Sequence, residues 1–223
     1  MAIKPILFNT EMVRAILDGR KDATRRIVKG FIPDDAVWEY TAFTPKGYIS
    51  CRGTFADGYG EKFFKLPCEP GDILYVRETW QYLYELDGNE QIIEGTGKYY
   101  YAATDTIPFD TYVDASGVTH ERVPWHPSIH MPKEAARIWL KVTDVKVERL
   151  QEISEDGAKA EGANFKNGKN VGFEEKMNRT AIERFAEIWN STIKKADLDR
   201  YDWDANPWVW VIEFEWCKKP EGV

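Results

Sequence analysis

The sequence has few cysteines, few histidines and no long apolar run, and each shortage excludes a class of protein. Its 223 residues include three cysteines and three histidines. An odd number of scattered cysteines with no C-x-x-C pair argues against a disulfide framework and a cysteine-based zinc site, and it favours a reducing, cytoplasmic setting. The apolar runs are much shorter than the ~20 residues that a membrane span needs, so we expect no association with a membrane.

Positive charge is also in short supply over the whole chain. The sequence holds 30 basic and 37 acidic residues, which gives a formal net charge of -7 at pH 7. This balance argues against tight, non-specific binding of duplex nucleic acid, because that binding needs a broad basic face. It still allows a small positive patch to bind one nucleotide, a short single strand or a small anion. The sequence contains no P-loop, G-x-G-x-x-G or G-x-S-x-G motif that would identify a site.

Short runs of aromatic and β-branched residues, separated by turn signals, fill most of the chain and predict β structure. We expect strands at residues 4–9, 24–28, 73–84, 99–103, 137–149 and 208–216, and hairpins within residues 37–60. We expect helices between Thr10 and Gly19, at residues 154–161 and at residues 174–195. Residues 104–132 and 165–172 lack periodicity and are expected to form loops. The whole pattern predicts an α+β, mainly β fold: a small β-barrel with flanking helices and long insertions.

The most informative stretch is residues 14–29, RAILDGRKDATRRIVK, which concentrates positive charge in an acidic protein. It holds six basic residues against two acidic ones, so it creates a local field suited to an anionic ligand. Lys21 and Thr24 lie three residues apart, and a neutral lysine can take a proton from a threonine hydroxyl if burial or nearby arginines lower its pKa. In the alternative interpretation, Arg20, Lys21 and Arg25 are solvated surface charges and Thr24 only begins a strand.

Two further positions carry charge beside expected secondary structure. Arg77 and Glu78 follow a turn at Gly71 and a strand, and they either line the mouth of a barrel or form a structural ion pair. Glu161 ends the helix expected at residues 154–161, but by itself it is one of many surface glutamates, and composition gives no reason to choose it.

The proline-rich segment around residues 125–133 combines aromatic and cationic side chains. Trp125, His130 and Lys133 on such a loop are suited to contact the bases of a single strand. His126 and His130 are four residues apart, but the neighbouring prolines disfavour a helix and no third ligand follows at a useful spacing. We therefore predict no metal site here.

Taken together, four motifs resemble the ASCH family: the G-R-K-x-x-T-x-R segment from Gly19, the G-D-x-L-x-V strand from Gly71, the short helix ending at Glu161 and the final V-I-E-F strand. The G-D-I-L-Y-V-R-E-T-W and S-I-H-M-P-K segments resemble the longer members found in phages and prophages. The resemblance implies a PUA-like β-barrel as a single domain over residues 1–223, with its core at about residues 1–30, 67–80 and 133–217. Residues of about 31–66 and 81–132 are then insertions.

The resemblance also implies a function. PUA-like barrels commonly bind RNA beside the barrel, and some small ASCH members are amidohydrolases that remove the acetyl group from N4-acetylcytidine without a cofactor. Their residues carry over to Thr24 as nucleophile, Lys21 as base, Glu161 as an acid or a group that orients the amine, and Arg26 as a substrate-binding neighbour. Asp22 stands where this motif commonly has threonine, and a carboxylate beside Lys21 would raise its pKa.

Two other functions stay open at this point. A non-catalytic RNA-binding module would contact phosphates with Arg20, Lys21, Arg25 and Arg26. It would contact bases with Trp125, His130 and Lys133, and Arg77 would be a further contact. A ribonuclease would use His130 as acid or base. The amidohydrolase interpretation requires that Lys21, Thr24 and Glu161 converge.

Overall fold

The computed structural model describes residues 1–85, 87–89, 91–107, 112–113, 118–120, 122–163 and 179–222. The chain is mixed α and β and mainly β, with 34% strand and 22% helix, which confirms the expected class. The small β-barrel expected from the sequence is not found, because over the residues described the sheets are open and none closes into a barrel. The loop expected at residues 165–172 and the first residues of the helix expected at 174–195 lie outside the described part.

Five strands follow one another in the order β1–β6–β11–β12–β2. They are β1 (Ile3–Leu7), β6 (Ile73–Arg77), β11 (Trp139–Arg149), β12 (Trp208–Trp216) and β2 (Ala23–Ile27). The antiparallel pairing of β12 with β2 sets Val211 opposite Arg25, Ile212 opposite Thr24 and Trp210 opposite Arg26. Because side chains alternate along a strand, Arg25 and Thr24 lie on opposite faces of β2.

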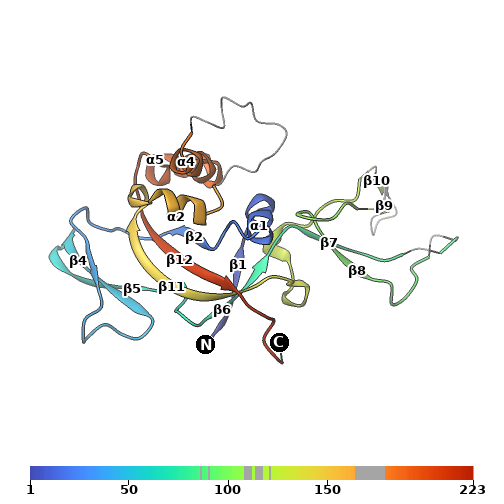
Figure 1. Cartoon of the computed structure of the whole chain (residues 1–223), viewed down its shortest axis with the longest axis horizontal. Coiled ribbons are helices and arrows are strands. Elements are labelled where there is room, and N and C mark those ends of the chain that lie inside the picture. The colour runs from blue at the N-terminus through green and yellow to red at the C-terminus, as the bar shows by residue number, and fades with distance from the viewer. Residues whose placement is uncertain are drawn as a thin grey trace. The chain divides into compact units, whose positions relative to one another are not determined.

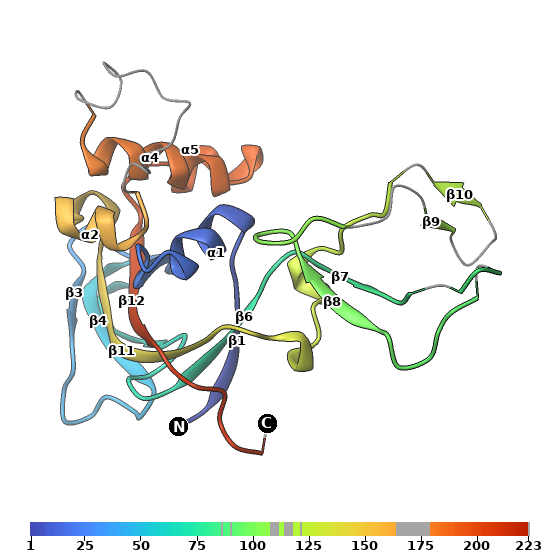
Figure 2. The same cartoon turned by 45° about the vertical axis from the view of Figure 1, so that its right-hand side comes forward.

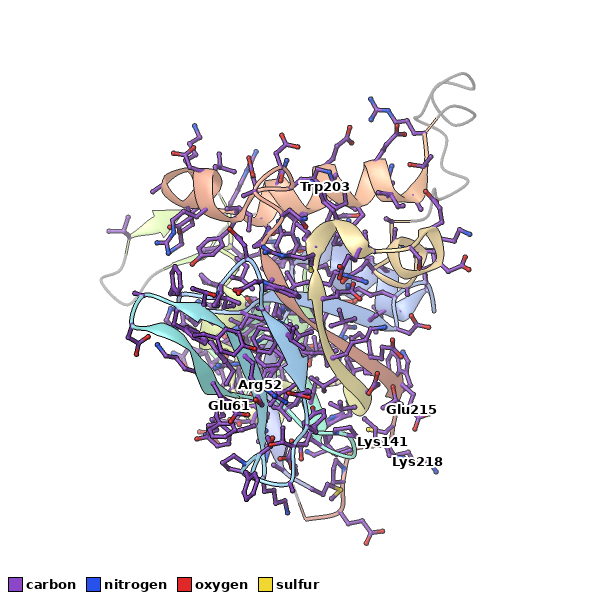
Figure 3. The ribbon with its side chains drawn as sticks, turned by 90° about the vertical axis from the view of Figure 1, so that its left-hand side faces the viewer. Arg52, Glu61, Lys141, Trp203, Glu215 and Lys218 are labelled. Atoms are coloured by element: carbon purple, nitrogen blue, oxygen red, sulfur yellow. The ribbon has the colours of Figure 1, made fainter. Side chains whose placement is uncertain are left out.

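Three smaller sheets use the remaining strands. They are β3 (Val37–Glu39) with β4 (Tyr48–Phe55) and β5 (Gly58–Lys65), β7 (Trp80–Leu83) with β8 (Lys98–Tyr101), and β9 (Tyr112–Val113) with β10 (Thr119–His120). In the β4–β5 pair, Arg52 and Glu61 lie opposite each other, as Figure 3 shows. Gly58 closes the turn between these strands with a φ of 110°, where glycine is favoured. The hairpins expected within residues 37–60 are confirmed.

Short helices connect the strands. They are α1 (Thr10–Leu17), α2 (Glu155–Ala160), α4 (Ala181–Thr192) and α5 (Leu198–Tyr201), with 3-10 turns η1 (Ser128–His130), η2 (Lys133–Ala135), η3 (Leu150–Glu152) and η4 (Lys195–Asp197). Asn9, rather than Thr10, caps α1, because its side chain accepts a bond of 2.9 Å from the Met12 N–H. Gly19 follows α1 with a φ of 68°, as expected for a helix end. None of the helices over the residues described is long and apolar enough to span a bilayer.

The chain divides into two compact units. Unit 1 comprises Met1–Ala2, Gly19–Ile73 and Lys141–Glu215. Unit 2 comprises Ile3–Asp18, Leu74–Leu140 and Trp216–Val223. The single domain over residues 1–223, with its core and insertions, stays a prediction.

The apolar core that supports the candidate site lies in unit 1. Helices α2 and α4 pack together on one side of β11 and β12, as Figures 1 and 2 show. Their buried residues form one cluster with β12 and the adjoining turns: Leu150, Ile153, Ala158, Ala163, Ala181, Phe185, Trp189, Val209 and Val211. By the register of β12 and β2, this is the face of β2 that carries Arg25.

The single strand expected at residues 73–84 was wrong, because the structure breaks it into β6 and β7, which belong to different sheets. The break falls at Glu78, whose side chain is 1% exposed and receives two bonds of 2.9 Å from Arg137. Arg77 donates to the Met131 carbonyl at 2.7 Å instead of pairing with Glu78. The first strand therefore ends beside a buried charge with a distant partner, and Glu78 forms a structural ion pair with Arg137, a residue outside the motif.

Truncation of the unit 1 core provides a test of this packing. Leu150 is fully buried, so Leu150→Ala should lower the free energy of unfolding by about 2–5 kcal/mol through lost contacts and a residual cavity. Phe43 is 85% exposed in the same unit, and Phe43→Ala should change that free energy by no more than about 0.5 kcal/mol. Urea unfolding followed by far-UV circular dichroism measures both. Equal effects of the two changes would contradict the assigned core.

Candidate functional site

The approach to β2 is tied to the end of α2 by the backbone. Lys21 and Glu161 form an antiparallel bridge, and the Asp22 N–H donates to the Ala160 carbonyl at 2.9 Å. Ser154 begins α2 by accepting from the Gly157 N–H at 3.0 Å, and Glu161 ends the helix by donating its N–H to Gly157 at 3.1 Å. The capping residues of a six-residue helix thus place Glu161 beside a lysine 140 residues away in sequence.

The Lys21 side chain is buried and makes three hydrogen bonds. Its Nζ donates to Glu161 Oε2 at 2.6 Å, to the Ala23 carbonyl at 2.7 Å and to the Glu161 carbonyl at 3.1 Å. An ammonium group has three N–H donors, so these acceptors match its full capacity. The bond to the carboxylate is charge-assisted and correspondingly short. The interpretation of Lys21 as a solvated surface charge is therefore wrong.

Arg25 joins the Lys21–Glu161 pair to β11. Its Nε and Nη2 donate to Glu148 Oε1 at 3.0 and 2.6 Å, and its Nη1 donates to Glu161 Oε1 at 3.3 Å. The side chain is 4% exposed, and its guanidinium lies 5.7 Å from the centre of the Phe185 ring. Arg25 is thus not solvated either. We call Lys21, Arg25, Glu148 and Glu161 the buried charge network.

Thr24 and Arg26 lie on the other face of β2. Thr24 is 1% exposed and opposite Ile212, while Arg26 is half-buried. Thr24 directly follows Ala23, whose carbonyl accepts from the Lys21 ammonium. The structure therefore brings two of the three required side chains, Lys21 and Glu161, into direct contact, whereas Thr24 lies on the face of β2 opposite Arg25, the second partner of Glu161.

Burial dominates the electrostatics of Lys21. It lowers the pKa of the Lys21 ammonium below the ordinary value of 10.5, against the opposing effect of the Glu161 carboxylate. The positive charges of Arg26 and Arg25 lower this pKa further. Burial also lowers the pKa of Arg26, again against the attraction of Glu161. The carboxylate that acts on Lys21 is that of Glu161, not of the exposed Asp22 singled out from the sequence.

A cleft of about 450 Å³ lies on the Arg25 side of unit 1. Arg25 and Glu148 line it, whereas Lys21, Thr24 and Glu161 do not. Its lining carries two basic residues, Arg25 and Lys146, against the five acidic residues Asp22, Glu148, Glu152, Asp156 and Glu213. This excess of negative charge disfavours phosphates. Within the part of the chain that the structure describes, no three His, Cys, Asp or Glu side chains gather closely enough to hold a metal ion.

The binding candidates Arg77, Trp125, His130 and Lys133 belong to unit 2, whereas the buried charge network belongs to unit 1. Trp125 is half-buried, and His130 is exposed within η1. The exposed Lys133 has its Nζ 5.9 Å from the centre of the Tyr75 ring. Arg77 is held by its bond to the Met131 carbonyl. In unit 1, Arg20 is half-buried and donates to the Gly162 carbonyl at 3.2 Å.

Glu148 is the member of the network that sequence reasoning missed. It lies near the end of β11. Earlier in this strand the burial pattern changes phase, because the consecutive residues Thr143 and Asp144 are both exposed. The break in the apolar alternation at these two residues was the available signal, since it decides which later side chains face the helices. Only the position of Arg25 on β2 identifies Glu148 as its half-buried partner.

Comparisons with protein-family models, with characterised proteins and with solved structures found no match to this chain. The ASCH resemblance therefore stays a prediction from the sequence motifs.

The lowered pKa of Lys21 predicts a specific dependence of stability on pH. As the pH rises, native Lys21 loses its proton before the unfolded chain does, so the unfolded state binds more protons up to a pH of about 10.5. The free energy of unfolding that depends on Lys21 should therefore increase with pH through this alkaline window. Urea unfolding of the wild type and of Lys21→Met measures the difference. Lys62→Met, which removes a lysine with a half-exposed side chain, should follow the wild-type slope. Parallel slopes for wild type and Lys21→Met would contradict the assignment.

Proposed function

We propose that this chain is an ASCH-type domain with a PUA-like fold that hydrolyses the amide of an N4-acylated cytidine. The observation that carries the proposal is the 2.6 Å contact between Lys21 and Glu161, two residues of separate ASCH-like motifs. Their burial and the mainly β architecture add support. A lysine whose pKa is lowered by burial suits general-base chemistry near neutral pH better than a solvated one.

The proposed reaction requires the Thr24 hydroxyl to reach Lys21: its oxygen attacks the acyl carbon while neutral Lys21 takes the hydroxyl proton. Glu161 stabilises the ammonium formed on Lys21, as the aspartate of a Ser-His-Asp triad stabilises the imidazolium of its histidine. The C–N bond then breaks, and Lys21 returns the proton to the departing N4 amine. Water attacks the acyl-threonine with Lys21 again as base, which releases the carboxylic acid and restores Thr24. One water is consumed and no cofactor takes part.

The burial of Lys21 and Arg25 counts against a non-catalytic RNA-binding module. Such a module would use Lys21 and Arg25 on phosphates, but both side chains are buried and bonded to carboxylates. Moving them to a surface phosphate would leave Glu161 as an uncompensated buried charge. Arg20 and Arg26 are the two basic residues of the motif that keep some exposure. The ribonuclease alternative depends on His130, for which no observation adds support.

Hydrolysis of N4-acetylcytidine tests the proposal directly. The wild type should release cytidine, and Lys21→Met and Thr24→Val should each lower kcat by at least about a hundredfold, because base and nucleophile are lost. Liquid chromatography of the nucleosides measures the rate, with unfolding curves to confirm that each variant is folded.

Two matched changes serve as controls for this experiment. Thr24→Ser keeps a hydroxyl and should retain measurable turnover, whereas Thr24→Val should not. Lys62→Met removes a lysine that pairs with Asp57 on the surface and should leave the rate unchanged. A folded wild type with no turnover would contradict the proposed function, and RNA binding that weakens with Arg26→Met would then favour the binding module.

A further inference from the structure

The two oxygens of the Glu161 carboxylate are divided between two cations. Oε2 accepts from Lys21 at 2.6 Å, and Oε1 accepts from Arg25 Nη1 at 3.3 Å. Because the Glu161 side chain is only 4% exposed, water contributes little to its solvation. The orientation of the carboxylate toward Lys21 is therefore fixed from both sides, and Arg25 supplies the second side.

Arg25 is itself held on three sides. Glu148 accepts from both Nε and Nη2, and the Phe185 ring of α4 lies beside the guanidinium. On the α2 side is Gly157, where an added Cβ would lie 3.2 Å from Arg25 Nη2. This arrangement uses the planar fork of an arginine, which a lysine ammonium cannot reproduce.

We propose that Arg25, anchored by Glu148, is a positioning residue: it holds Glu161 Oε1, so that the Glu161 carboxylate meets Lys21 through Oε2 alone. The role in catalysis rests on the proposed function, whereas the effect on the Lys21 proton does not. The motif-derived set of Lys21, Thr24, Glu161 and Arg26 includes neither Arg25 nor Glu148.

The charges around Lys21 fix the sign of the effect. Removing the positive charge of Arg25 removes a repulsion that lowers the pKa of Lys21. It also frees Glu161 Oε1, so the carboxylate attracts the Lys21 ammonium more strongly. Both effects raise the pKa of Lys21. The charged groups that face this centre are Lys21, Arg25 and Arg26 from β2 and its approach, Glu148 from β11 and Glu161 from the end of α2.

The opposite sign is expected when the anchor is changed. In Glu148→Gln, the guanidinium of Arg25 loses its stronger partner and pairs more closely with Glu161. The carboxylate is then less available to Lys21, so the pKa of Lys21 falls. A purely structural role for these residues gives no reason for two destabilising changes to move one titration in opposite directions.

The test is a titration of Lys21 observed through its Nζ by ¹⁵N NMR, with the signal assigned by its absence in Lys21→Met. The midpoint should rise in Arg25→Met, fall in Glu148→Gln and stay close to the wild-type value in Arg25→Lys, which keeps the charge. Arg137→Met removes an ion pair with Glu78 in unit 2 and should leave the midpoint unchanged. If Arg25→Met does not fold, Glu148→Gln and Arg25→Lys still decide the question.

Turnover of N4-acetylcytidine gives the second readout. In Arg25→Met, kcat near pH 7 should fall on the order of tenfold for each unit by which the midpoint rises, and a higher pH should restore it. Arg25→Lys should recover the pH profile but not the full rate, because a lysine lacks the fork that holds Glu161. A lower melting temperature without any movement of the titration would overturn the positioning role.

The two proposals fail in different ways. Absence of turnover in the wild type refutes the hydrolase, while the NMR midpoints still decide whether Arg25 controls the Lys21 proton. Turnover with an unmoved midpoint in both Arg25→Met and Glu148→Gln refutes the positioning role and leaves the hydrolase in place.

Discussion

The buried contact between Lys21 and Glu161 is the constraint on which the candidate site depends. The two side chains are 0% and 4% exposed, and desolvating two such charges costs several kcal/mol for each ion. The fold offsets this cost only by satisfying every donor of the ammonium and by giving the carboxylate a second cation. The backbone bridge between the same two residues keeps both ends of the contact in register.

The buried charge network contains two cations and two anions, so it is neutral as a unit while each member is strongly constrained. Apolar residues of similar volume would often stabilise such a position equally well. The adjoining apolar cluster around Leu150 and Phe185 supplies the burial that holds α2 and α4 in place. The network is therefore weak evidence for added stability, and its proposed role is to hold the Lys21 proton in place.

Local patterns predicted the elements that carry the site. The strand at residues 208–216, the helix that begins after Ser154 and ends at Glu161, and the turn at Gly19 all follow from alternation and capping residues. The same patterns could not predict which charges are buried. Lys21 and Arg25 find their partners 140 and 123 residues away, and a sequence window contains no record of such pairs. The prediction of a single strand at residues 73–84 failed for the same reason, because Glu78 pairs with Arg137, 59 residues further on.

The absence of a Cβ at Gly157 limits which substitutions this part of the sequence can accept. Glycine weakens a six-residue helix, yet a methyl group there would lie 3.2 Å from Arg25 Nη2 and from Ile153 Cγ1. These atoms would have to shift by a few tenths of an ångström, and the guanidinium is already fixed by two carboxylates. The helix and the arginine thus compete for one small volume. Substitutions at Gly157 and Arg25 are therefore coupled. A better helix former at position 157 would displace Arg25 and weaken its hydrogen bond to Glu161.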